Sequence, residues 1–206
     1  MKEIAKNLLD IQAVKLSPSE PFVWASGIKS PIYCDNRLTI SYPKIRTAIA
    51  QGIAALIKEN YPEAEVIAGT ATAGIPHAAW IAAELNLPLI YVRSKPKDHG
   101  RGKQIEGVLK PGAKTVVIDD LLSTGGSVLK AVKAAQNEGA DVLGVGAIFS
   151  YQLQAITDNF AAENLSYFTL TNYTELLEAA VENDYISADE QKVLAQWRLA
   201  PEKWNG

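Results

Sequence analysis

The chain has 206 residues, of which 48% are hydrophobic and 21% are charged, as in ordinary packed globular proteins. Its net charge of −3 argues against a nucleic-acid partner held by a broad positive field. Cys34 is the only cysteine, which excludes an intramolecular disulfide, and no stretch approaches the roughly 20 apolar residues that span a bilayer. Because Met1–Leu16 also lacks the apolar core of a secretory signal, we expect a cytoplasmic protein without a membrane partner.

The N-terminal third predicts helices around an irregular segment. Apolar residues at helical spacing predict a short amphipathic helix within Met1–Ala13. Phe22–Arg37 is rich in glycine, proline and aromatic residues, which favours short strands and turns. A helix is expected from about Tyr42 to Glu59, with Ser41 as its N-cap and Pro43 in its first turn.

The middle of the chain alternates between strand and helix patterns. Apolar runs of strand length occur at Val66–Gly69, Leu89–Val92, Thr115–Asp119 and Val142–Phe149. Helical patterns lie between them at Pro76–Leu85 and Ser127–Glu138, the second followed by Gly139 as a C-cap signal. This alternation predicts an α/β fold, a doubly wound and mostly parallel sheet covered on both faces. We expect residues 1–206 to form a single domain in which about 1–38 make a small hood.

The C-terminal part predicts two helices and little else. They span Asn172–Asn183 and Ser187–Trp197, and Ser187 with Glu190 matches a capping box. In doubly wound folds, ligands bind beyond the carboxyl ends of the strands. The loops that follow Gly69, Val92 and Asp119 are therefore the candidate binding site.

Two acids and a glycine-rich loop end the third predicted core strand. Asp119 and Asp120 suit the neutral hydroxyl groups of a sugar, because carboxylates accept hydrogen bonds and repel phosphate. Ser123–Ser127 leads into a helix, where glycine lets backbone N–H groups approach an anion and the helix N-terminus favours negative charge. An ordinary strand–turn–helix connection explains the loop alone about as well, but it leaves the paired acids unexplained.

The run Val116–Ser127 resembles the phosphoribosyl-pyrophosphate signature of type I phosphoribosyltransferases. The resemblance implies that Asp119 and Asp120 bind the ribose hydroxyls and that the following loop holds the 5′-phosphate. The loop residues are Leu121, Leu122, Ser123, Thr124, Gly125, Gly126 and Ser127, with Ser123 also near the base. Gly69–Ile75, including Thr70 and Ala71, corresponds to the family's pyrophosphate loop; a tight βα turn is the alternative.

Arg93–Gly107 is basic, contains three glycines and has almost no apolar residues, which favours a mobile lid over an anionic substrate. A solvated loop is the alternative. Lys97-Asp98-His99-Gly100, followed by Ile105-Glu106-Gly107, resembles the catalytic lid of orotate phosphoribosyltransferases, and Ser26–Asp35 resembles their hood. The resemblance implies that Arg93, Lys97 and His99 bind the pyrophosphate. Lys97 and His99 are then catalytic, together with the paired aspartates.

Three positions depart from the family pattern. Ala25 stands where some members have a lysine, and Ser94 stands where some have a second basic residue. An orotate-binding arginine of some members falls around Tyr151, which cannot carry its charge. Lys29 and Arg37 are the candidates for balancing the orotate carboxylate.

The resemblance implies transfer of the phosphoribosyl group from 5-phospho-α-D-ribose 1-diphosphate to orotate, giving orotidine 5′-monophosphate and pyrophosphate in UMP biosynthesis. It also implies Mg²⁺, held largely by substrate oxygens and water without a dedicated protein metal site, and a homodimer with shared active sites. Three alternatives remain open. They are a purine phosphoribosyltransferase, a non-catalytic regulator that senses the same sugar diphosphate, and a generic α/β binding domain.

Overall fold

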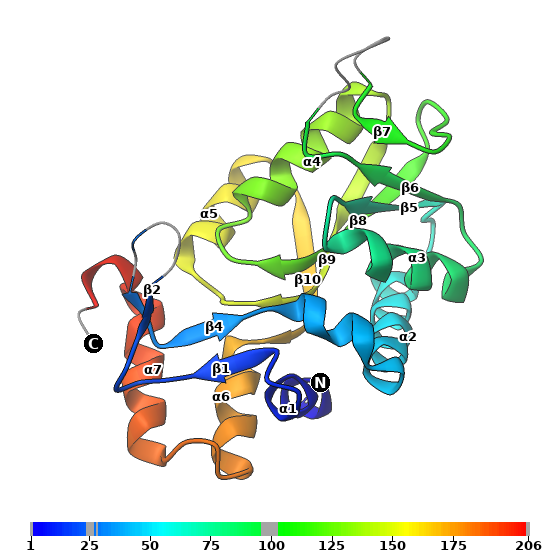
Figure 1. The fold of residues 1–206 in the computed structure, drawn as a ribbon. Helices are drawn as coiled ribbons and strands as arrows, with labels where there is room; N and C mark the ends of the chain where they lie inside the picture. The colour runs from blue at the N-terminus through cyan, green and yellow to red at the C-terminus, as the bar shows by residue number, and fades with distance from the viewer. Residues whose placement is uncertain (1, 24–26, 28, 96–102, 205–206) are drawn as a thin grey trace.

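The computed structural model describes residues 2–23, 27, 29–95 and 103–204, which build one central sheet with helices on both faces (Figure 1). The helices are α1 (Lys2–Asp10), α2 (Pro43–Asn60), α3 (Gly74–Leu85), α4 (Gly126–Asn137), α5 (Gln154–Ala162), α6 (Tyr173–Glu182), α7 (Ala188–Leu199) and the 3-10 helices η1 (Asn36–Ser41) and η2 (Pro201–Lys203). The strands are β1 (Val14–Leu16), β2 (Phe22–Val23), β3 (Lys29–Ser30), β4 (Ile32–Cys34), β5 (Val66–Thr70), β6 (Leu89–Val92), β7 (Ile105–Glu106), β8 (Lys114–Leu122), β9 (Asp141–Ser150) and β10 (Ser166–Asn172).

The central sheet has the order β10-β9-β8-β5-β6-β7. All neighbouring pairs are parallel except β6 and β7, which pair antiparallel. Parallel strands place their carboxyl ends at the same edge of the sheet. The register pairs Gly69 with Ile118 and Asp119 with Ala147, so the predicted site loops meet at that edge. This confirms the mostly parallel, doubly wound sheet.

Alternate side chains of the strands pack on opposite faces of the sheet. On β8, Val116 and Ile118 belong to the apolar core under α2 and α3, whereas Val117 belongs to the core under α4 and α5. All three are fully buried. A strand buried on both faces explains why β8 is a continuous apolar run that ends only at its two acids.

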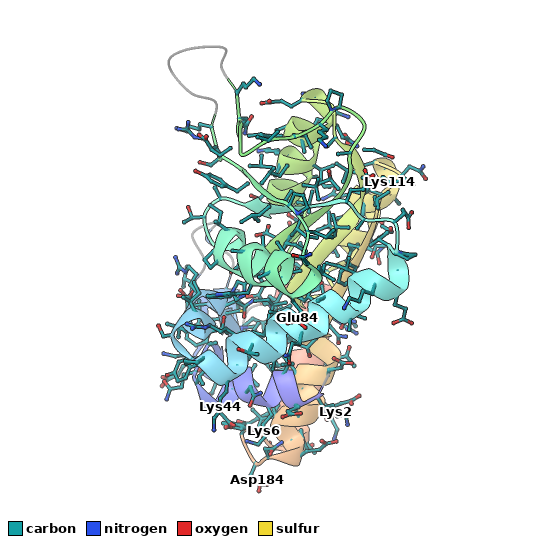
Figure 2. All side chains as sticks on the ribbon, turned by 90° about the vertical axis from the view of Figure 1, so that its right-hand side faces the viewer. Lys2, Lys6, Lys44, Glu84, Lys114 and Asp184 are labelled. Carbon is teal, nitrogen blue, oxygen red and sulfur yellow. The ribbon has the colours of Figure 1, made fainter. Side chains whose placement is uncertain are left out.

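The first 38 residues contribute to two parts of the molecule. Strand β1 pairs antiparallel with β4, and β2 pairs with β3, in two small sheets that lie apart from the central one. Helix α1 instead packs against α6, where Ile4 and Leu8 join the main core. At the surface Lys2 reaches Glu178 and Glu182 of α6, and Figure 2 shows Lys2 and Lys6 of α1 in the lower part of the molecule.

The predicted helices and core strands are present, with small shifts of their ends. The expected N-cap was wrong: Ser41 lies inside η1, and Tyr42 precedes α2 without a side-chain cap. Pro43 does begin α2, and the capping box of Ser187 and Glu190 is confirmed. Six elements were not predicted, namely β1, β7, β10, α5 and the 3-10 helices η1 and η2. None of the described helices combines the length and apolar character that crossing a bilayer requires.

Candidate active site

Asp119 and Asp120 stand side by side near the end of β8. The Thr70 hydroxyl, at the end of neighbouring β5, donates to Asp119 Oδ1 at 2.7 Å, and the Asp120 N–H donates to the same oxygen at 2.9 Å. Burial raises the pKa of both carboxyl groups, and the Asp119 charge further raises the pKa of Asp120, to about 7. The pair is thus a fixed acceptor for hydroxyl groups that binds a proton more tightly than free carboxyl groups do.

A buried polar network of Asn36, Thr39 and His77 contacts the backbone of Asp120. Asn36 Nδ2 donates to the Asp120 carbonyl oxygen at 2.7 Å, and the Thr39 hydroxyl donates to the Asn36 carbonyl oxygen at 2.6 Å. Thr39 Oγ1 also lies 3.3 Å from His77 Nε2 on α3. Burial lowers the pKa of His77 to about 4, so its ring is neutral at pH 7.

This network was not predicted from the sequence. Asn36 and Asp120 are 84 positions apart in the chain, and the sequence alone does not distinguish a buried polar residue from an exposed one. The brief polar run in the chain around Asn36 predicts a turn, and only the fold places it against β8. We find no sequence signal that would have identified it.

The loop after β8 forms a cradle at the start of α4. Gly125, the N-cap residue, has φ +79°, and a Cβ there would lie 2.7 Å from the Phe160 ring. The N-cap makes no side-chain hydrogen bond to the helix, so the first N–H groups of α4 have no capping side chain. Asn159 Nδ2 holds the Thr124 carbonyl oxygen at 2.9 Å. An uncapped helix N-terminus behind a fixed glycine turn is a suitable anion site.

The loop between β5 and α3 has a packing reason for its glycines. A Cβ at Gly74 would lie 2.5 Å from both the Ile118 carbonyl oxygen and the Thr70 hydroxyl. The Ala71 N–H donates to the Val92 carbonyl oxygen at 2.9 Å, which ties the loop to β6. The glycines therefore do not by themselves indicate phosphate binding, and the Ala71 amide already has a partner.

Two hydrogen bonds join the two ends of the predicted lid at the edge of the sheet. The Arg93 N–H donates to the Gln104 carbonyl oxygen at 2.9 Å, and Gln104 Nε2 donates to the Arg93 carbonyl oxygen at 2.7 Å. The Arg93 guanidinium lies 3.6 Å from Glu106 on β7. Lys97 and His99, the predicted catalytic residues of the lid, lie outside the described residues.

The residues considered for the orotate carboxylate have different surroundings. Arg37 pairs with Asp35, 2.6 Å from Nε to Oδ1, so a carboxylate already balances its charge. Lys29 on β3 is exposed, and its carbonyl oxygen accepts from Trp197 Nε1 at 3.3 Å. Tyr151 is buried, and this burial raises the pKa of its hydroxyl group well above the usual value.

The sequence matches a family model described as a phosphoribosyl transferase domain over residues 41–176. It is 66% identical to the orotate phosphoribosyltransferase of Lactiplantibacillus plantarum, over 98% of this chain and 95% of that protein. It is 61% identical to the orotate phosphoribosyltransferase of Bacillus subtilis, over 97% of this chain and 92% of that protein.

The fold is also similar to the crystal structure of orotate phosphoribosyltransferase from Aeropyrum pernix. The two chains are 25% identical and have a TM-score of 0.75, with 89% of this chain and 99% of that chain covered. The family match lies on the sheet and loops that carry the paired aspartates, and the relatives extend the similarity over nearly the whole chain. This chain belongs to the orotate phosphoribosyltransferase family.

Proposed function

We propose that the chain transfers the phosphoribosyl group from 5-phospho-α-D-ribose 1-diphosphate to N1 of orotate. The products are orotidine 5′-monophosphate and pyrophosphate, and the pathway is UMP biosynthesis. The observation that carries the assignment is the half-buried Asp119–Asp120 pair shortly before the uncapped N-terminus of α4, in a chain of this family. A diol acceptor beside an anion site matches a ribose 5-phosphate group.

Catalysis by positioning of the substrates explains the proposed reaction better than covalent catalysis by a nucleophilic side chain. Breaking the C1–O bond builds positive charge on the ribose ring and negative charge on the leaving pyrophosphate. Asp119 and Asp120 hold the diol, and the loop Leu121–Ser127 holds the 5′-phosphate, so C1 is fixed between the leaving group and the base. Burial raises the pKa of the Cys34 thiol well above its usual value, which makes it a poor nucleophile.

The leaving group belongs at the loops after β5 and β6. Thr70 and Ala71 border it on one side, and Arg93, Lys97 and His99 offer positive charge or hydrogen-bond donors on the other. Such groups stabilise the charge that develops on pyrophosphate. Ser123 borders the base. These roles rest on the family resemblance and on the shared edge of the sheet.

Magnesium is part of the proposal. Within the described part of the chain, no group of three or more His, Cys, Asp or Glu side chains could hold a metal ion. The proposed Mg²⁺ would therefore be held mainly by oxygens of the substrates and by water, as suits an ion that gives up its water ligands reluctantly, while Asp119 and Asp120 remain the acceptors for the diol. When bound, the ion would neutralise charge on the diphosphate.

The cellular location, the oligomeric state and the domain organisation are also proposed. We propose a cytoplasmic homodimer in which the lid of one subunit reaches the active site of the other. We further propose that residues 1–206 work as one domain, with about 1–38 covering the base. The single cysteine suits a reducing compartment, and the net negative charge fits a protein without a nucleic-acid partner.

Loss of orotate absorbance tests the activity directly. The purified protein should consume orotate only when the sugar diphosphate and Mg²⁺ are both present, with one pyrophosphate released per orotate. Asp120→Ala should abolish the reaction. Consumption of adenine, hypoxanthine or xanthine in place of orotate would instead identify a purine enzyme, and tight binding of the sugar diphosphate without turnover would identify a regulator.

A further inference from the structure

A pocket of about 540 Å³ opens beside the phosphate loop. Three segments line it: Ser123 and Thr124 after β8, Leu153–Ala155 after β9, and Arg198–Lys203 at the end of α7 and in η2. Its lining is mostly apolar. The C-terminal segment, to which sequence analysis gave no role, thus forms one wall of a pocket that shares Ser123 with the proposed site.

The stereochemistry of the proposed reaction points to this side of the sheet. The sugar diphosphate carries its leaving group in the α configuration and the nucleotide product is a β-glycoside, so the base must approach C1 opposite the pyrophosphate. In the sheet order β9-β8-β5-β6, the pyrophosphate belongs at the loops of β5 and β6. The base then belongs across β8, on the side of β9, where Leu153 and the C-terminal segment line the pocket.

Arg198 is suited to binding a carboxylate group. It is half-buried, and its Nη1 donates to Gln152 Oε1 at 2.9 Å and to Thr174 Oγ1 at 2.8 Å. Both acceptors are neutral, so they orient the guanidinium without balancing its charge. No acid of the described chain forms an ion pair with Arg198, in contrast to Arg37, which is paired with Asp35. Its remaining N–H groups suit a bidentate carboxylate.

The segment that carries Arg198 is held firmly against the hood. Trp197 is fully buried, its ring lies 5.6 Å from that of Tyr173, and its Nε1 donates to the Lys29 carbonyl oxygen on β3. Directly after Arg198, Leu199 is 77% exposed although it lines the pocket. A flat ring bound there would cover an apolar side chain that is otherwise in water.

We propose that Arg198 determines the specificity for the acceptor base by binding the orotate carboxylate, while Leu153 and Leu199 contact the pyrimidine ring. This assignment rests on the proposed function, because it concerns the acceptor of that reaction. It supplies the charge that Tyr151 cannot carry. Glu202 also lines the pocket, but it is exposed and lies next to Lys203.

The test compares Arg198→Met with Lys192→Met, which removes the same charge from an exposed position on the same helix. Arg198→Met should raise KM for orotate at least about tenfold, as expected for loss of a charge-assisted hydrogen bond. KM for the sugar diphosphate should stay within about twofold. Uracil, which is orotate without the carboxylate, should inhibit both proteins and the wild type equally well. Arg198→Lys should restore part of the affinity for orotate.

An unchanged KM for orotate in Arg198→Met would overturn the proposal. Equal weakening of orotate and uracil would also overturn it, because Arg198 would then only support the shape of the pocket. Thermal unfolding of each variant verifies that it is folded. Failure of the proposed function is a separate result, since the wild type would then not consume orotate at all.

Discussion

Burial disfavours the charged form of Asp119 and Asp120, whereas binding of the proposed diol favours it because the diol donates hydrogen bonds to charged acceptors. Two features of the structure favour the ionised form of Asp119, namely the Thr70 hydroxyl and the Asp120 N–H. For Asp120, the Asp119 charge acts in the opposite direction. The free protein should therefore hold a proton on this pair up to about neutral pH, and a bound diol would donate hydrogen bonds to the ionised form.

Asp120→Asn should change the pH dependence of stability. The pKa of Asp120 rises from 3.8 to about 7 on folding, so its contribution to stability is fully present below pH 3.8 and is lost as pH rises through 7. The asparagine cannot ionise, so the variant should gain about 1–3 kcal/mol over the wild type between pH 4 and pH 8. Urea unfolding at several pH values measures this gain.

The exposed Asp141 at the start of β9 supplies the control, as Asp141→Asn. If the difference between Asp120→Asn and the wild type stayed constant from pH 4 to pH 8, Asp120 would not be the titrating group.

Thr70→Val should weaken binding of the sugar diphosphate. The change removes a 2.7 Å hydrogen bond to Asp119 and leaves a part-buried carboxylate oxygen with one donor fewer. KM for the sugar diphosphate should rise about tenfold. Thr115→Val is the matched control, because its buried hydroxyl donates to the Ala113 carbonyl oxygen at the far end of β8. Equal KM values in the two variants would contradict the positioning role of Thr70.

At the scale of elements, the pairing of β5 with β8 places Thr70 beside Asp119, and α3 packs very close to both strands. Gly69 and Gly74 permit this approach, since a Cβ at either position would come within 3 Å of neighbouring atoms. The strands β5, β8 and β9 were predictable because strands buried on both faces are continuous apolar runs, and β6 is a shorter apolar run of the same kind in sequence although one of its faces is partly exposed. The short strands β1 and β7 were not, since two or three residues carry no periodic signal.

Gly74→Ala should separate α3 from the sheet. The new methyl group would lie 2.5 Å from the Ile118 carbonyl oxygen, which belongs to a strand that cannot move freely. We expect a loss of about 1–3 kcal/mol in the free energy of unfolding, measured in urea. At Gly126 the nearest atom to an added Cβ is Thr124 Oγ1, at 3.8 Å, so Gly126→Ala should cost much less stability. Comparable losses would show that the close approach of α3 is not critical.

For the whole molecule, the sequence indicated the sheet, the phosphate loop and the family, because each of these is local in the chain. It did not indicate contacts between distant segments. Asn36 supports Asp120 across 84 positions, and the C-terminal segment reaches the pocket beside Ser123. Such contacts depend on how the layers pack, so neither the Asn36 network nor the role proposed for Arg198 was predictable from residue patterns.

The proposed shared site predicts complementation between inactive proteins. Lys97→Ala should lower kcat far more than it weakens substrate binding, and Asp120→Ala should be inactive. If the lid of one subunit serves the site of the other, mixed dimers contain one site with both native residues. Mixing the two proteins should then restore partial orotate consumption. The absence of any recovery, once subunit exchange is verified, would count against a shared site.

A crystal structure with bound orotidine 5′-monophosphate tests the central claim most directly. We expect the ribose diol to contact Asp119 and Asp120, and the phosphate to accept hydrogen bonds from the N–H groups of the Ser123–Ser127 loop. A nucleotide bound elsewhere, with these carboxylates and amides free of ligand, would contradict it.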